Sequence, residues 1–324
     1  MARARSGRDR QVMDLQPPGS PHRDGRPVVV GVDGSRPAAD ALRAGARAAA
    51  ARGAALEVVL AFPWSEADVV PAPEGFDGLA VLRMAAEQVL EEAATAARTA
   101  APGLSVATRI EVGRPVDVLV RESDRAQLLC LGTTGRGLVT DLVIGSTAAA
   151  LVQLAHCPVL LVPWTPPWST RSRSGVVVGL APGELDPAVA AFAFAEAASR
   201  GCQLVAVRAW AHTVPGAAGL LEPFVDAATA QRREESALDD ALTEASAQHA
   251  GVVVQQVAER GSAARLLLAA ALTAELVVVG HRHHRLARLG SVASAVVHRA
   301  GCPVAVVPLL DRPAPVPAAP VTSG

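Results

Sequence analysis

The sequence predicts an α/β fold of two tandem domains, each a doubly wound, five-stranded parallel sheet with helices on both faces. The first observation behind this prediction is length, because 324 residues suffice for two domains of about 150 residues, each with its own core. The second is alternation: short runs of Val, Ile and Leu alternate with Ala-rich segments of helical period. Strands that alternate with helices form parallel sheets with helical crossovers.

The third observation is an internal repeat that covers most of the chain. Residues 28–33 recur as residues 176–181, an offset of 148. Beyond Gly132 the offset changes, because Gly145 and Ser146 recur as Gly290 and Ser291, an offset of 145. The second copy therefore lacks three residues, and the deletion lies in the loop that follows Gly132 in the first copy.

The elements of each copy follow from the same periodicity. The first helix, residues 36–52, begins after Ser35, which suits an N-cap, and has Pro37 in its first turn. In the first copy we expect strands near 27–33, 56–62, 104–112, 127–132 and 158–162 and further helices near 79–101, 114–125 and 145–156. In the second copy we expect strands and helices in the same order near 175–181, 185–200, 203–209, 226–249, 252–258, 262–273, 275–280, 290–300 and 303–307.

Segments rich in Pro, Arg, Ser and Gly divide the chain. We expect a disordered tail at 1–26, the first domain at 27–163, a linker at 164–174, the second domain at 175–308 and a tail at 309–324. The arginines of the first tail are not followed by an apolar stretch, so we interpret it as a tail and not as a signal peptide. The 4 cysteines lack C-x-x-C spacing, which favours reduced core residues in a cytoplasmic protein.

The charges exclude several partners and chemistries. A net charge of -1 offers no basic face for nucleic acid, so we expect no nucleic-acid partner. Every one of the 30 basic residues is Arg, which excludes Schiff-base catalysis and the Walker A loop, since both require Lys. Residues 142–168 contain no Asp, Glu, Lys or Arg, but the matching stretch carries Arg288 and Arg299, so we expect no membrane span.

The candidate site lies in the first copy. Open parallel sheets bind ligands beyond the carboxyl ends of their strands, where the strand order reverses. This rule indicates Asp33, after the first strand, and the glycine-rich loop that follows Gly132 and leads into a helix. Glycines allow close approach of the backbone to an anion, and a helix N-terminus favours phosphate oxygens. The alternative interpretation of this segment is a plain turn followed by a helix N-cap, without a bound anion.

The spacing of this loop resembles a family motif. Gly132, two residues, Gly135, nine residues and then Gly145 and Ser146 resemble the G-x2-G-x9-G-S/T nucleotide motif of the universal stress protein family. The resemblance extends to V-V-V-G-V-D-G-S at 28–35, to C-P-V-L-L-V-P at 157–163 and to the tandem arrangement. It implies a fold similar to that of the adenine nucleotide alpha hydrolases.

By this resemblance the ligand is ATP. Asp33 is expected to contact adenine, and Ala61, at the end of the second strand, to lie beside the base. The glycines of the loop are expected to line the ribose and phosphates, and the start of the last helix to cradle the phosphates. The implied nucleotide-binding residues are Asp33, Ala61, Gly132, Gly135, Gly145, Ser146 and Thr147.

Two alternatives remain open at this site. Asp33 suits an Asx-turn with the following Gly34 and Ser35 as well as a bond to the exocyclic amine of adenine. Asp141 is compatible with a contact to a phosphate-bound Mg²⁺, although we favour a solvated loop acid. No resident metal and no catalytic residue is assigned.

The second copy departs from the motif. Ala181 replaces Asp33, and His283 replaces Gly135. A residual anion site at Gly290 is retained as an alternative, whereas we do not expect a full ATP site. The loop beginning at His281 invites a metal hypothesis, but a solvated basic loop that meets acidic or phosphate groups of a partner is favoured, since no cysteine or carboxylate completes a ligand set.

These observations favour a cytoplasmic, ATP-binding stress-response sensor or regulatory module over a catalyst. The alternatives are a slow ATPase, autokinase or nucleotidyl-transfer enzyme, and an interaction scaffold that binds no nucleotide. The fifth strands, 158–162 and 303–307, precede Pro163 and Pro308 and are expected at sheet edges. Because the resembled family dimerises through this strand, the resemblance implies that the two halves dock on each other, and a further homodimer is an option.

Overall fold

The chain is described by a computed structural model over residues 25–62, 78–134, 144–164, 173–181, 187–210, 227–282 and 289–309. The tails and most of the expected linker lie outside these residues. The first half contains β1 (Val28–Gly31), α1 (Arg36–Arg52), β2 (Leu56–Phe62), α2 (Gly78–Ala100), β3 (Val106–Val112), α3 (Pro115–Ser123), β4 (Leu128–Gly132), α4 (Ser146–Leu154) and β5 (Val159–Val162). The second half contains β6 (Val176–Gly179), α5 (Pro187–Arg200), β7 (Leu204–Trp210), α6 (Ala227–Gln248), β8 (Val254–Arg260), α7 (Ala263–Ala270), β9 (Leu276–Arg282), α8 (Ser291–Arg299) and β10 (Val304–Leu309).

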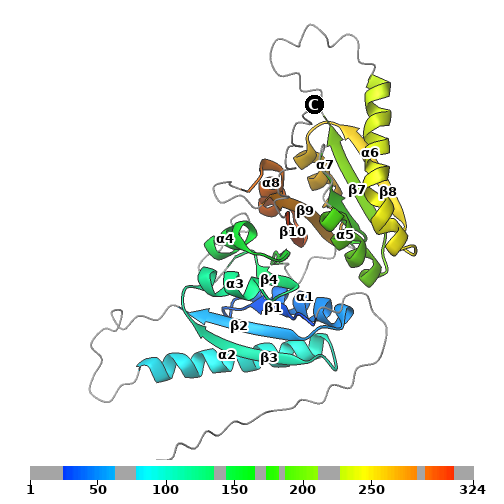
Figure 1. Cartoon of the computed structure of the whole chain (residues 1–324). Helices are drawn as coiled ribbons and strands as arrows, with labels where there is room; N and C mark the ends of the chain where they lie inside the picture. Colours follow the sequence, from blue (N-terminus) through cyan, green and yellow to red (C-terminus); the bar gives the residue numbers. More distant parts are fainter. Residues whose placement is uncertain are drawn as a thin grey trace, which may run out of the picture.

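The predicted doubly wound α/β fold is confirmed in both halves (Figure 1). The strands follow the order β3-β2-β1-β4-β5 in the first half and β8-β7-β6-β9-β10 in the second, and all pairings within a half are parallel. Helices α1, α2, α5 and α6 pack on one face of the sheet, and α3, α4, α7 and α8 pack on the other. Parallel strands need this double cover because both of their faces are apolar.

One antiparallel pairing joins the two halves. Strand β10 pairs with β5, with Ala305 opposite Leu160, so that the described strands form a single ten-stranded sheet. We call this pairing the seam. Strand β10 runs past Pro308, where we expected it to end, and Pro308 pairs with His281 of β9. The seam covers Val304–Val306 only, so Pro308 lies where one flank of β10 is no longer paired with β5, and a residue without an N–H is tolerated there.

The membrane question can be answered for the described part of the chain. Within residues 142–168, the described segments form the short helix α4 and the strand β5. Among all described helices, none combines the length and the apolar character that a bilayer crossing requires.

A buried carboxylate links the two halves beside the seam. Glu196 of α5 accepts hydrogen bonds from Arg52 of α1 and, at 2.6 Å, from Arg200 of its own helix, and its side chain is 3% exposed. Arg52 and Arg200 occupy the same position in the two repeats, whereas the repeat position of Glu196 is Ala48 in the first half. Burial disfavours the charged carboxylate, but the two guanidinium groups outweigh that cost and hold the pKa of Glu196 below its ordinary value.

The start of α1 packs directly on the end of β4. Ser35 caps the helix by accepting from the Ala38 N–H at 3.3 Å, as predicted, and Pro37 lies in the first turn. A Cβ atom on Gly132 would lie 2.7 Å from the carbonyl carbon of Pro37 and 2.9 Å from the nitrogen of Ala38, which is closer than backbone atoms tolerate. Gly132 therefore allows the strand to approach the helix, and this contact fixes the floor of the candidate site.

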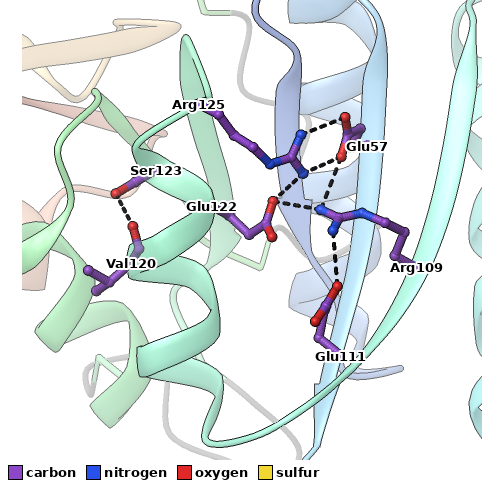
Figure 2. Close-up of polar contacts among 7 residues, drawn as sticks. All are labelled: Glu57, Arg109, Glu111, Val120, Glu122, Ser123 and Arg125. Atoms are coloured by element: carbon purple, nitrogen blue, oxygen red, sulfur yellow. Dashed lines mark hydrogen bonds and ion pairs between the residues drawn. The ribbon is translucent and has the colours of Figure 1, made fainter.

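The first half also contains a network of charges between β2, β3 and α3 (Figure 2). Arg109 donates to Glu57 at 3.1 Å, to Glu111 at 3.0 Å and to Glu122 at 2.6 Å, and Arg125 donates to Glu57 at 2.8 Å and also to Glu122. The hydrogen bonds and positive charge of Arg125 and Arg109 hold the pKa of Glu57 below its ordinary value of 4.5. Glu122 is buried, and both arginines form ion pairs with its carboxylate.

The second half fills the same positions with apolar side chains. The residues at the positions of Glu57, Arg109 and Glu122 are Val205, Val257 and Ala270, and each packs against the core. Glu122 is the one buried member of the charge network, and burying a carboxylate carries a desolvation cost that apolar packing avoids. The same positions are therefore occupied by ion pairs in the first half and by apolar contacts in the second.

We expect Gly132→Ala to lower the free energy of unfolding by about 1–3 kcal/mol, because the new methyl group pushes α1 away from β4. The control is Gly251→Ala, since a Cβ at Gly251 meets nothing within 4 Å. Urea denaturation measures both, and equal stability of the two variants would contradict the packing role.

We expect Arg109→Val alone to cost about 1–3 kcal/mol, because it removes one of two cations from buried Glu122. The combined replacement by second-half residues (Glu57→Val, Arg109→Val, Glu122→Ala and Arg125→Thr) should cost less than the sum of its single changes.

With its lowered folded-state pKa, Glu57 stabilises the wild type above pH 4.5 and loses that contribution as the pH falls through the lowered value. Urea titrations between pH 3 and pH 7 should show this loss of stability in the wild type and a smaller loss in the combined variant. Strict additivity of the four single changes at pH 7 would contradict the coupling between these charges.

Candidate functional site

A cavity of about 350 Å³ opens at the carboxyl ends of β1 and β4. The strand order reverses at this point, because β1 lies between β2 and β4. Six of the seven predicted site residues line this one cavity: Asp33, Ala61, Gly132, Gly145, Ser146 and Thr147. The seventh, Gly135, lies outside the described residues, as do Arg136 and Asp141. The volume falls within the range of about 300–1,000 Å³ usual for small-molecule pockets.

Asp33 forms the Asx-turn that the sequence left open. Its Oδ1 accepts from the Ser35 N–H at 2.9 Å, which orders the backbone between β1 and α1. A carboxylate has two oxygens with about four acceptor positions, so this turn leaves Oδ2 able to accept from a ligand. The turn and the ligand contact are therefore compatible, and the turn aims the half-buried side chain at the cavity that it lines.

The opposite wall is the start of α4. Its N-cap is Gly145, which supplies no side-chain cap, so within the described residues the backbone N–H groups of the first turn are uncapped and suit an anion. The Gly145 N–H donates to the Thr133 carbonyl at 2.7 Å, and the Thr133 N–H donates to the Val162 carbonyl at 3.1 Å. These two bonds fix both ends of the glycine-rich loop at the cavity. Ser146 and Thr147 add hydroxyl groups to the same wall.

Ten further lining residues were not predicted, and four of them bear on the chemistry of the cavity. Thr133 and Thr134 lie between the motif glycines, directly after β4, so their position in the sequence could have indicated them. Pro115 and Leu119 come from the start of α3, which the fold brings over the cavity. The apolar part of the lining includes Pro115 and Leu119 together with Val32 and Val59. The polar part includes the hydroxyl groups and the N-terminus of α4. This division suits a ligand with a flat apolar part and an anionic part.

The second half has an equivalent but poorer cavity. It measures about 180 Å³, and its described lining residues are glycines and aliphatic residues throughout. Ala181 stands at the position of Asp33 and Val292 at the position of Thr147. The described wall therefore lacks the carboxylate and the hydroxyl that distinguish the first cavity.

The basic segment of the second half belongs partly to the sheet. His281 and Arg282, which we expected in a loop, end strand β9, and His281 is 4% exposed. His283, His284 and Arg285 lie outside the described residues. The described residues contain no group of three His, Cys, Asp or Glu placed to hold a metal ion.

The four cysteines lie away from both cavities. All are free, and Cys130, Cys157 and Cys302 are buried while Cys202 is half-buried. Burial raises the pKa of Cys157 to about 12 and that of Cys302 to about 11. Thiols held protonated in this way are poor nucleophiles, in agreement with the core role expected for them.

Comparisons with known proteins agree with this architecture. The model of the universal stress protein family matches residues 25–163 and 174–308. Universal stress protein Rv1996 of Mycobacterium tuberculosis is 33% identical over 314 residues, which cover 89% of this chain and 96% of that protein. Universal stress protein Rv2005c of the same organism is 33% identical over 295 residues, covering 86% and 96%.

A solved structure shares the fold over the same length. The crystal structure of a universal stress protein from Archaeoglobus fulgidus superposes with a TM-score of 0.64, covering 89% of this chain and 97% of the other, at 16% identity. With two matches to the family model and relatives similar over most of their length, the chain belongs to the universal stress protein family and carries two copies of its domain.

Proposed function

We propose that the first half binds ATP in the 350 Å³ cavity and that the protein acts as a nucleotide-dependent stress-response sensor or regulatory module. The observation that carries this proposal is the convergence of a turn-held carboxylate, at Asp33, and the uncapped N-terminus of α4 on one cavity. The carboxylate suits an exocyclic amine, and the helix N-terminus suits phosphate oxygens.

The proposed ligand position follows from these two walls. Adenine lies in the apolar part beside Ala61, with its amine on Asp33. The ribose lies near Gly132 and Gly135, and the phosphates lie against Gly145, Ser146 and Thr147. A Mg²⁺ ion held by the phosphates, with Asp141 as a candidate ligand, is an optional part of this proposal.

The second half serves as a partner domain in this proposal. We assign nucleotide binding to a domain spanning 27–163 and the degenerate motif to a domain spanning 175–308, docked through the seam. The apolar wall at Ala181 and Val292 argues against a second ATP site. We propose a cytoplasmic setting, since four free cysteines suit a reducing compartment.

We expect Asp33→Asn to weaken ATP binding at least tenfold, roughly the value of a hydrogen bond to a charged group. The Asn side chain retains one oxygen for the Ser35 N–H but presents an NH₂ group to the adenine amine, so stability should stay within about 0.5 kcal/mol of the wild type. Equilibrium binding of labelled ATP measures this, with Asp240→Asn on α6 as an exposed control. Unchanged affinity would remove Asp33 from the site.

We expect Thr147→Val, which copies Val292 of the second half, to weaken ATP but not adenosine, because adenosine carries no phosphate for that hydroxyl to contact. Isothermal titration with both ligands tests this split. If neither ligand binds the wild type or raises its Tm, the scaffold alternative takes precedence. Rapid turnover of bound ATP would instead favour an enzyme.

A further inference from the structure

A second large cleft lies across the seam and shares no lining residue with the ATP cavity proposed above. It measures about 580 Å³ and is bounded by α1, the end of β5, α5 and the residue before β10. Its charged lining residues are Asp40, Arg43, Arg47, Arg52, Arg173, Glu196, Arg200 and Glu275. We call this space the seam cleft.

The seam cleft carries more positive than negative charge. Five arginines face three carboxylates among its lining residues. Arg43 pairs with Asp40, whereas Arg52 and Arg200 share the single carboxylate of Glu196. One negative charge thus offsets two positive ones, and a surplus of positive charge remains at the junction of the halves.

Two arginines contribute most of that surplus. Within the described part of the chain, neither Arg47 of α1 nor Arg173 has an ion pair with a carboxylate. Arg47 donates to a backbone carbonyl of its own helix at 3.3 Å, and Arg173 donates to the carbonyl of Gly301. Arg47 belongs to the first half, whereas Arg173 lies in the expected linker and is bonded to Gly301 of the second half, so a ligand that meets both would bridge the seam.

Arg173 supplies independent evidence of a missing acceptor. Its Nη1 is buried and has no hydrogen-bond partner among the described residues. Buried guanidinium nitrogens are almost always paired, and an unpaired one indicates an acceptor from a ligand or an ordered water. Arg173 lines a cleft of ligand size and also contacts the Cys302 thiol, and its guanidinium group must turn toward the cleft for Nη1 to meet a ligand there.

We propose that the seam cleft binds an oligophosphate anion, held by Arg47 of the first half and by Arg173, the linker residue that is bonded to Gly301 of the second half. A phosphate group offers up to two negative charges and three strong acceptor oxygens, which suits a surplus of guanidinium donors better than a single carboxylate does. The planar guanidinium group binds such oxygens in pairs. A bound anion would attach α1 to the second half and so stabilise the seam.

The test uses the full-length protein and inorganic tripolyphosphate as the probe, measured by isothermal titration. Arg47→Gln and Arg173→Gln should each raise the dissociation constant at least tenfold, while Arg83→Gln, on an exposed turn of α2, should not change it. Added salt should weaken binding, because the interaction is ionic. Arg47 is exposed, so its variant keeps the fold even if loss of Arg173 disturbs it.

Three outcomes would overturn the proposal. Unchanged tripolyphosphate binding in Arg47→Gln is one. Loss of binding in Thr147→Val but not in the arginine variants is another, since the anion would then lie in the ATP cavity. Binding of citrate as tight as that of tripolyphosphate is the third, because it would show a site without phosphate preference.

The proposal stands apart from ATP binding by the first half. Adenosine binding should survive Arg47→Gln and Arg173→Gln, and tripolyphosphate binding at the seam should survive Asp33→Asn. Failure of adenosine and ATP binding with intact tripolyphosphate binding would defeat only the proposed function. If adenosine and ATP bind but tripolyphosphate does not bind at the seam, only the seam-cleft proposal fails.

Discussion

The architecture depends on one constraint: strands buried on both faces must find a paired neighbour on both flanks. Every residue of β5 is buried, and β10 is buried from Val304 to Val307, so neither strand suits an edge exposed to water. Their antiparallel pairing removes both edges at once. The true edges are β3 and β8, whose residues are mostly exposed or half-buried and include charged and amide side chains.

The same layering positions the candidate site. Because β1 and β4 are neighbours whose crossovers leave in opposite directions, a space opens between their carboxyl ends. The depth of that space depends on how closely α1 approaches β4, and Gly132 allows this approach by lacking a Cβ atom. Gly132, which the family motif predicts as a contact to the ribose and phosphates, thus also has a packing role in the structure.

Local signals predicted what depends on neighbours in the sequence. Ser35 as an N-cap, Asp33 after β1 and Gly145 before α4 could each be assigned from a few adjacent residues, and the repeat gave the fold class. Contacts between distant elements could not be assigned in this way. The positions of Leu119 at the ATP cavity and of Arg173 in the seam cleft depend on tertiary packing, and β9 extends to Arg282 because β10 continues beside it.

The two copies differ in a consistent direction. Where the first half has a carboxylate or hydroxyl at its cavity, the second has Ala181 and Val292, and where the first has an ion network around buried Glu122, the second packs Val205 and Val257. At the seam the direction reverses, because Ala48 of the first half corresponds to Glu196 of the second, which holds Arg52. The second half thus has fewer polar groups at its own cavity and one more charge at the interface than the first. This difference supports the proposed division, in which the first half binds the ligand and the second half supports it.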